Sequence, residues 1–177
     1  ISGGWSSGGN YQRYYDNLVS YHNKLYGINY RNIQVYYGNA GDATTLQSGG
    51  DLSGSGTNVD DVINNLDEIR QSVRDRCALR NPALTRLAII GSNHGSDNSG
   101  LCLWGSNNAG DRFYTPVELQ EDLTGCLQST QIMIIMDQCY SGEFVTQITD
   151  TSVTSHTCIF AAAHDEEPSY GREYPDR

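Results

Sequence analysis

A histidine and a cysteine each follow an apolar run of the sequence, and together they could carry out nucleophilic catalysis. His94 follows the run at residues 87–91, and Cys139 follows the run at residues 132–136. A cysteine thiolate attacks a carbonyl carbon, and a histidine within reach can activate the thiol and then protonate the leaving amine. The pair therefore indicates a cysteine peptidase, whose partner is a protein or peptide substrate.

Two neighbouring strands of one sheet would bring these side chains together. Both apolar runs have the length and β-branched content of strands buried on both faces of a parallel sheet. In such sheets, functional groups gather beyond the carboxyl ends of the strands. His94 precedes Cys139 by 45 residues, which leaves room for one helix between the two strands.

An oxyanion hole is the third requirement of this chemistry. The backbone N–H groups of Gly95 and Cys139 could form it, because a glycine has no Cβ to obstruct a substrate carbonyl. Structural interpretations stay open for each residue. Gly95 also fits a tight turn, a lone histidine after a strand is usually a hydrogen-bonded loop residue, and a lone cysteine is usually small, buried and apolar.

The composition predicts a single domain over residues 1–177, long enough to bury about 70% of its unfolded surface. The net charge of −10 argues against nucleic acid and anionic membranes as partners. No apolar stretch approaches the ~20 residues that span a bilayer, so we expect no membrane insertion. The other histidines lack zinc-ligand spacing and the loop acids fail the EF-hand pattern, so we expect no metal and no cofactor.

The first strand of the expected fold is almost missing from the sequence. A parallel α/β domain should begin with a buried strand, yet only Ile1 precedes the Gly/Ser-rich loop at residues 2–9. We therefore expect a piece of a longer chain, in which the first strand and the C-terminal elements are incomplete. Such a piece could associate with other segments of its own precursor.

Other patterns predict the elements around the two central strands. Apolar spacing predicts a helix at residues 11–25 that Gly27 stops, and a second helix at residues 59–73. Thr115 and Pro116 predict the start of a further helix, with Thr115 as the N-cap and Pro116 as the first helical residue. The remaining predictions are a strand at residues 33–37, a hairpin at 101–104, a polar loop after Cys139, and a buried strand at 158–163.

The other four cysteines are compatible with two disulfides in an oxidising compartment. Cys77 and Cys126 each precede one of the central strands, so a bridge between them is the first expectation. Four reduced core thiols are the alternative. A single lysine, Lys24, and abundant Tyr, Asn, Gly, Ser and Thr also favour an extracellular or periplasmic location.

Four separated segments share their order with one group of peptidases. An apolar strand leads to His94-Gly95, and a second leads to Asp137, Cys139 and Ser141-Gly142. The segments at residues 8–13 and 162–170 are similar to the legumain motifs Ser-Asn-Gly-x-x-Asn-Tyr-Arg-His and Ala-Ala-Asn-Pro-Arg-Glu-Ser-Ser-Tyr. The chain thus resembles the caspase-like cysteine peptidases, and most of all the legumain family.

This resemblance implies a fold and roles for individual residues. The implied fold is α/β, a caspase-like three-layer sandwich with a mostly parallel sheet flanked by helices. Asn10 falls on the asparagine that orients the catalytic histidine. Ser169 falls in the segment that lines the specificity pocket.

Three positions bear on substrate choice. Gln12 stands where legumains have an arginine of the pocket that selects Asn. Asp137 lies two residues before the nucleophile, where metacaspases have Asp, and Asp16 resembles an aspartate of the first metacaspase helix. A pocket of Asp16 and Asp137 would select Arg or Lys at P1 through charge-assisted hydrogen bonds. Asn at P1 is the alternative, and either aspartate could instead be a solvated carboxylate.

The sequence therefore predicts a cysteine endopeptidase in which Cys139 and His94, oriented by Asn10, cleave after a basic residue or Asn. The alternative is a catalytically inactive caspase-like domain that serves in binding or assembly. That alternative stays open because one fold can keep its shape after its activity is lost.

Overall fold

The computed structural model describes residues 1–4, 12–38, 57–60, 66–78, 86–103, 113–127, 129–149 and 156–169. A six-stranded sheet with the order β3-β2-β1-β4-β8-β9 forms the centre, and each neighbouring pair is parallel. Its strands are β1 (Ser2–Gly3), β2 (Ile33–Gly38), β3 (Thr57–Asp60), β4 (Arg86–Ser92), β8 (Gln131–Asp137) and β9 (Thr157–Ala161). A small antiparallel sheet contains β5 (Gly95–Ser96), β6 (Gly100–Cys102) and β7 (Phe113–Tyr114).

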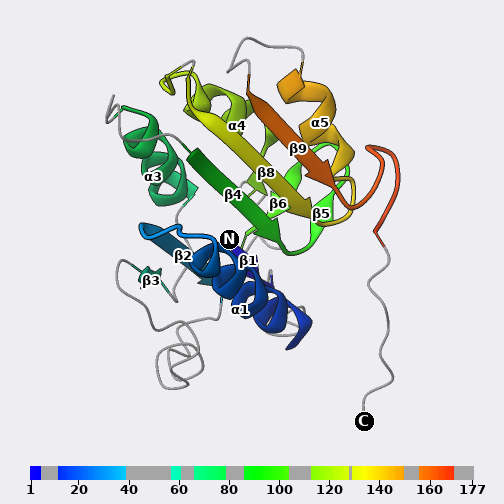
Figure 1. Ribbon diagram of the computed structural model, residues 1–177. Helices are drawn as coiled ribbons and strands as arrows, with labels where there is room; N and C mark the ends of the chain where they lie inside the picture. The colour runs from blue at the N-terminus through cyan, green and yellow to red at the C-terminus, as the bar shows by residue number, and fades with distance from the viewer. Residues whose placement is uncertain are drawn as a thin grey trace.

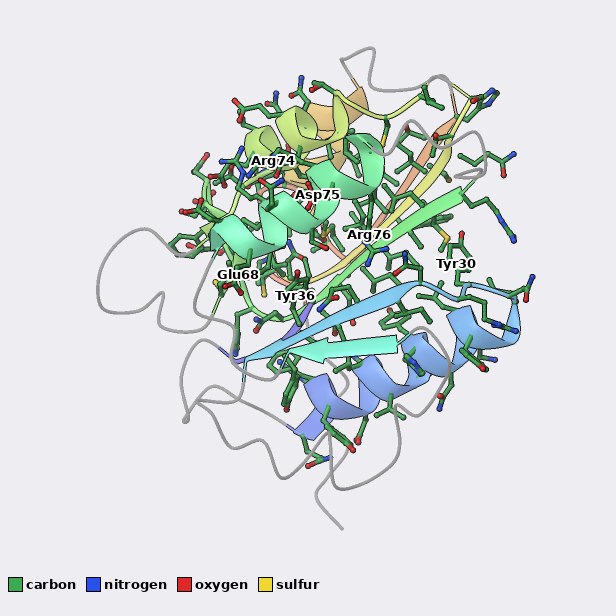
Figure 2. All side chains as sticks on the ribbon, turned by 90° about the vertical axis from the view of Figure 1, so that its left-hand side faces the viewer. Tyr30, Tyr36, Glu68, Arg74, Asp75 and Arg76 are labelled. Carbon is green, nitrogen blue, oxygen red and sulfur yellow. A yellow bond between two sulfur atoms is a disulfide. The ribbon has the colours of Figure 1, made fainter. Side chains whose placement is uncertain are left out.

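Helices cover the two faces of the large sheet. They are α1 (Gln12–Gly27), α3 (Leu66–Ala78), α4 (Pro116–Leu123) and α5 (Gly142–Thr149). Figure 1 shows α1 against β1 and β2 on the near face, with α4 and α5 behind β8 and β9. In Figure 2, β2 and β4 run between α3 and α1. The predicted α/β class with a parallel sheet flanked by helices is confirmed, and the arrangement is compatible with a three-layer sandwich.

The two apolar runs of the sequence form the central strands β4 and β8. They pair in parallel over their whole length, from Arg86 opposite Gln131 to Ser92 opposite Asp137. Alternate side chains, such as Ile89 and Ile134, are buried in the main hydrophobic core, which β4 and β8 share with α3, α4 and α5. The prediction of neighbouring parallel strands is therefore confirmed.

Helix α1 ends two residues after residue 25, where the sequence pattern predicts its end. Gly27 is the last helical residue, and Asn29 adopts the left-handed conformation with φ of 74°. The N–H groups of Tyr30 and Asn29 donate to the carbonyls of Leu25 and Tyr26, at 3.0 and 3.2 Å. This is a Schellman arrangement, and Asn takes the position that glycine usually occupies because it tolerates positive φ better than most residues.

Helix α4 begins as the sequence predicts. Thr115 is the N-cap, with Pro116 as the first helical residue. The Thr115 hydroxyl accepts a hydrogen bond from the Glu118 N–H (3.2 Å), and the Glu118 carboxylate accepts one from the Thr115 N–H (3.0 Å). This reciprocal capping box satisfies two backbone donors at the start of the helix.

The hairpin expected near residue 102 corresponds to β6, which pairs with β5 and β7.

Three predictions of secondary structure are wrong. Val59 lies in strand β3 opposite Val35, not in a helix, and the second helix runs from Leu66 to Ala78. The segment after Cys139 is helix α5 rather than a polar loop. Strand β9 is at the edge of the sheet, and Phe160 is 55% exposed, so β9 is not a buried strand.

One disulfide joins the end of α3 to the turn after α4. Cys77 and Cys126 are bonded across a separation of 49 residues, which confirms the bridge expected first. A bridge of this kind typically stabilises a fold by about 2–4 kcal/mol, largely by restricting the unfolded chain. Cys102 is a buried thiol and Cys158 an exposed one, so the expectation of a second disulfide is wrong.

Asp122 lies at the centre of an ion-pair network between α3 and α4. Its side chain is 1% exposed, and each of its oxygens accepts a hydrogen bond of 3.1 Å from Arg70. Arg74 donates to the same carboxylate at 2.9 Å, and the Tyr114 hydroxyl also donates to it, at 3.0 Å. The hydrogen bond to Asp122 raises the pKa of Arg70. Burial, together with the Asp122 charge, raises the pKa of Tyr114. Arg70 is thus held in its charged form, and Tyr114 in the neutral form whose hydroxyl can donate.

No helix within the described ranges is long and apolar enough to cross a membrane. The described part of the chain is also without a group of three or more His, Cys, Asp or Glu side chains that could hold a metal ion.

Candidate active site

The carboxyl ends of β4 and β8 bring the His94 and Cys139 segments side by side. Ser92 and Asp137 are register partners at the end of these strands, and each predicted catalytic residue follows two positions later. Gly95 packs directly against the turn that follows β8. A Cβ on Gly95 would overlap the carbonyl of Cys139 and lie 2.8 Å from Cγ of Gln138. The glycine is therefore required for the close approach of two backbones, which is a different reason from the substrate clearance inferred from the sequence.

A buried asparagine fixes the backbone of His94. Asn93 is 4% exposed, and its Oδ1 accepts a hydrogen bond of 2.7 Å from the His94 N–H. Its Nδ2 donates to the carbonyl of Cys102 at 2.8 Å, and the Cys102 N–H donates to the carbonyl of His94 at 2.8 Å. The two bonds to Cys102 tie the turn after β4 to β6, so the position of His94 is set by the small antiparallel sheet.

The imidazole of His94 contacts the first helix. The ring of Tyr14 meets it edge to face, with centroids 5.3 Å apart and an interplanar angle of 71°. Tyr14 is 3% exposed and Arg13 lies over its ring, 5.1 Å from the centroid. Sequence reasoning missed both Tyr14 and Asn93. The spacing of Tyr14 and Leu18 in the helix pattern indicated burial, but it did not indicate a contact with the histidine.

Cys139 is a half-buried thiol that contacts the segment after β9. Its Sγ lies 3.5 Å from the carbonyl oxygen of Ser169, and the Ser169 hydroxyl donates to the sulfur at 3.7 Å. The next residue, Tyr140, has a φ of 56°, and its N–H donates to the carbonyl of Glu167 at 2.9 Å. A bulky residue in the left-handed region is uncommon, and such conformations concentrate at functional sites. The structure thus brings Ser169 to Cys139.

The Ser-Gly pair after Cys139 joins two loops. The Ser141 hydroxyl accepts a hydrogen bond of 3.0 Å from the Ala163 N–H. A Cβ on Gly142 would overlap the N–H of Asp165 and lie 2.8 Å from the carbonyl carbon of His164. Both residues therefore hold the turn after β8 against the turn after β9, and this contact places the Ser169 segment beside the thiol.

Asp137 faces α1 from the end of β8. Its Oδ2 accepts hydrogen bonds from Nδ2 of Asn17 (3.0 Å) and the hydroxyl of Ser92 (3.2 Å). Asn17 also donates to Ser92 at 3.1 Å. Burial and, second to it, the negative charge of Asp137 raise the pKa of Tyr21. Asp137 is therefore a half-buried carboxylate, and both of its hydrogen bonds within the described part of the chain fall on one oxygen.

The structure brings Asn17, rather than Asp16, to Asp137. Asp16 is exposed, and its carboxylate accepts a hydrogen bond of 3.1 Å from Nε2 of Gln12 one turn earlier. Neighbouring helical residues point about 100° apart, so Asp16 and Asn17 project from different sides of α1. Gln12 is exposed as well. Asn10, the predicted orienting residue, lies outside the described residues.

An acidic hollow adjoins the same loops. It is lined by Asp97, Asn98, Glu143, Asp165 and Glu166. Glu143 accepts a hydrogen bond of 2.6 Å from the N–H of Asn98. Burial raises the pKa of Glu143 most, the nearby charges of Asp97 and Asp165 add to the rise, and the hydrogen bond from Asn98 opposes it. Four of its five lining residues are carboxylates, so the hollow is acidic.

No protein family, no curated protein and no solved structure matches the chain. The chemistry of the site is therefore inferred from its own geometry.

Proposed function

We propose that the protein is a cysteine endopeptidase of the caspase-like type, with Cys139 as nucleophile and His94 as general base and acid. The observation that carries the proposal is the packing of the His94-Gly95 turn directly against the backbone of Cys139. In addition, His94 and Cys139 follow two adjacent parallel strands, so both residues lie at the same edge of the sheet. The strained turn at Tyr140 supports the proposal, because it follows the nucleophile immediately.

The proposed reaction assigns a role to each residue. Cys139 attacks the scissile carbonyl after its proton passes to His94, and the N–H groups of Gly95 and Cys139 stabilise the oxyanion. His94 then protonates the leaving amine and activates water for hydrolysis of the acyl-enzyme. Orientation of His94 by Asn10 stays a prediction. Tyr14 and Asn93 are the residues whose observed contacts position the histidine.

A peptide acyloxymethyl ketone with Arg at P1 tests this function. We expect it to alkylate Cys139 and to spare Cys158, although Cys158 is the more exposed thiol. The reactivity of a thiol depends on how its surroundings shift its ionisation, and not on its exposure alone. Peptide mapping by mass spectrometry would locate the adduct, with urea-unfolded protein as the control in which selectivity is lost. Faster labelling of Cys158 than of Cys139 in the folded protein would contradict the proposal.

The proposed substrate is a peptide with Arg or Lys at P1. Asp137 is half-buried, and its Oδ1 has no hydrogen bond within the described part of the chain, so this oxygen can accept one from a cationic side chain. The acidic hollow around Glu143 favours the approach of the same class of substrate. Exposed Gln12 supplies no positive charge for an Asn pocket. Ser169 is the proposed residue of the pocket wall, because it lies beside the thiol.

Fluorogenic peptides that differ at P1 test this preference. We expect Arg and Lys to be cleaved faster than Asn, Asp or Leu. Asp137→Asn should lower kcat/KM on the Arg peptide by roughly 10- to 100-fold, the effect of one charge-assisted hydrogen bond. The matched control is Asp16→Asn, which should change it less than about twofold because Asp16 is an exposed surface acid. Preference for Asn, or equal effects of the two variants, would refute the acidic pocket.

The alternative function is binding or assembly by a catalytically inactive domain. The exposed strand β9 favours this alternative, because Phe160 is 55% exposed at the edge of the sheet. Failure of the ketone probe to label Cys139 would favour it further. For either function we infer an extracellular or periplasmic location from the disulfide, since such bonds persist in oxidising compartments.

A further inference from the structure

Asp137 is held through only one of its two carboxylate oxygens. Its Oδ2 accepts both hydrogen bonds, from Nδ2 of Asn17 at 3.0 Å and from the hydroxyl of Ser92 at 3.2 Å. Asn17 also donates to the Ser92 hydroxyl at 3.1 Å, so the three side chains form a closed triangle. A carboxylate oxygen accepts along two lone pairs, and both of those on Oδ2 are therefore occupied.

Three separate elements fix this triangle. Asn17 comes from α1, Ser92 from the end of β4 and Asp137 from the end of β8. The two strand residues are register partners, and Ser92 is 1% exposed. Figure 1 shows the ends of β4 and β8 side by side. The carboxylate cannot exchange its oxygens without breaking two hydrogen bonds, so Oδ1 is the oxygen that remains for a ligand.

The groups around this carboxylate are uncharged. Both donors are neutral, and Asp137 forms no ion pair with any described residue. Burial and, second to it, the charge of Asp137 raise the pKa of Tyr21, one turn after Asn17 on α1, so its phenol also stays neutral. Buried charges are normally paired. The negative charge of Asp137 is therefore uncompensated until a cation binds.

We propose that Asn17 and Ser92 are positioning residues that leave Asp137 a single free oxygen, so that the site accepts Lys and Arg at P1 equally well. This inference rests on the proposed peptidase function and on Asp137 as the acid of its pocket. Arg has an advantage over Lys where a carboxylate offers both oxygens to the two parallel N–H groups of a guanidinium. A single oxygen removes that advantage, because an ammonium needs only one acceptor.

Peptides that differ only at P1 test the proposal on the native protein. We expect kcat/KM for the Lys peptide to lie within about threefold of that for the Arg peptide, because neither side chain can bind both oxygens. A citrulline peptide, which keeps the shape of Arg without its charge, should be cleaved at least about tenfold more slowly than either.

Removing one donor should create the preference that the native site lacks. Asn17→Ala frees a lone pair of Oδ2 for the second N–H group of Arg, so the Arg-to-Lys ratio of kcat/KM should rise about tenfold. The change should lie mainly in KM for Arg, since the contact forms in the bound substrate as well as in the transition state. Ser92→Ala removes the other donor and should act in the same direction. It also serves as the test if Asn17→Ala does not fold.

Asn23→Ala is the matched control on the same helix. Asn23 is exposed and does not contact Asp137, so the Arg-to-Lys ratio should stay within about twofold of the native value. A purely structural role of the triangle would lower cleavage of both peptides in parallel. The ratio therefore separates positioning of the carboxylate from a general loss of stability.

The outcomes distinguish this proposal from the peptidase function. An Arg peptide cleaved more than about tenfold faster than the Lys peptide, with Asp137→Asn still slowing both, would overturn the single-oxygen site and leave the peptidase intact. An unchanged ratio in both Asn17→Ala and Ser92→Ala would also overturn it. If no peptide is cleaved, titration calorimetry decides. Equal affinity for the Arg and Lys peptides that Asp137→Asn abolishes would support the site and reject the peptidase, and absence of binding would reject both.

Discussion

Under the proposed mechanism, replacing Cys139 with alanine will abolish peptide cleavage, with a loss of kcat/KM of at least about 10³-fold, because no other nucleophile can form the acyl-enzyme. His94→Ala will have an effect of the same order, since neither residue works without the other. Both variants should keep their fold, because His94 and Cys139 are both half-buried in turns after strand ends. Steady-state kinetics with an Arg peptide and circular dichroism would measure the two properties.

Cys158→Ala is the matched control for that experiment. Cys158 is a thiol on the edge strand β9 and is exposed, so its removal should leave kcat/KM within about twofold of the unaltered protein, as for most surface substitutions. Cleavage that persists in Cys139→Ala, or that disappears in Cys158→Ala, would show that the nucleophile has been assigned to the wrong residue.

Asp122→Ala will destabilise the domain by about 3–5 kcal/mol, the usual result of removing one partner from a buried ion pair. The substitution leaves Arg70, Arg74 and the buried hydroxyl of Tyr114 without their common acceptor. Urea unfolding monitored by fluorescence would give the free energy of unfolding of each variant. This loss of stability measures the cost of leaving buried hydrogen-bond donors without an acceptor, and not the net strength of the ion pairs.

Glu121→Ala is the matched control on the same helix. Glu121 also accepts a hydrogen bond from Arg70, at 2.9 Å, but its side chain is 62% exposed. Exposed pairs contribute about 0–1 kcal/mol, so we expect a small change in the free energy of unfolding. Similar losses for the two variants would mean that burial of Asp122 is not what makes the network important.

The central strands and the disulfide were predictable because they depend on features that the sequence shows directly. Strands β4 and β8 are uninterrupted apolar runs, which are typical of central strands in a parallel sheet, although one face of each strand is mostly half-buried rather than buried. Cys77 and Cys126 precede these strands, and parallel neighbours begin at the same edge of the sheet. The order of the elements was therefore enough to place the two cysteines close together.

The contacts of the site depend on helix phase, which the sequence pattern leaves open. Asp16 and Asn17 are adjacent in the chain, yet only Asn17 reaches Asp137. Neighbouring side chains on a helix point about 100° apart. An error of one residue in the assumed orientation of α1 therefore decides which of these two side chains faces Asp137. The sequence placed Asp16 and Asp137 together in a pocket for a basic side chain, whereas the phase of α1 brings the uncharged Asn17 to Asp137.

Helix α5 was missed because its residues have modest intrinsic helix propensity. It contains two threonines and starts with glycine, and tertiary burial decides its conformation. Phe144 and Ile148 are 0% and 2% exposed, and their spacing of four residues places both on one face. That spacing was the available signal, but the helix is too short for the periodicity to be convincing by itself.

The bridge between Cys77 and Cys126 encloses the part of the chain that carries His94, while Cys139 lies beyond it. A backbone cut between residues 78 and 125 would therefore divide the chain without releasing either piece. Nicked protein would migrate as one molecule in electrophoresis until a reductant is added, and only then as two. Any cleavage within this loop would leave the histidine and the cysteine in a single two-chain molecule, joined by sulfur as well as by the sheet.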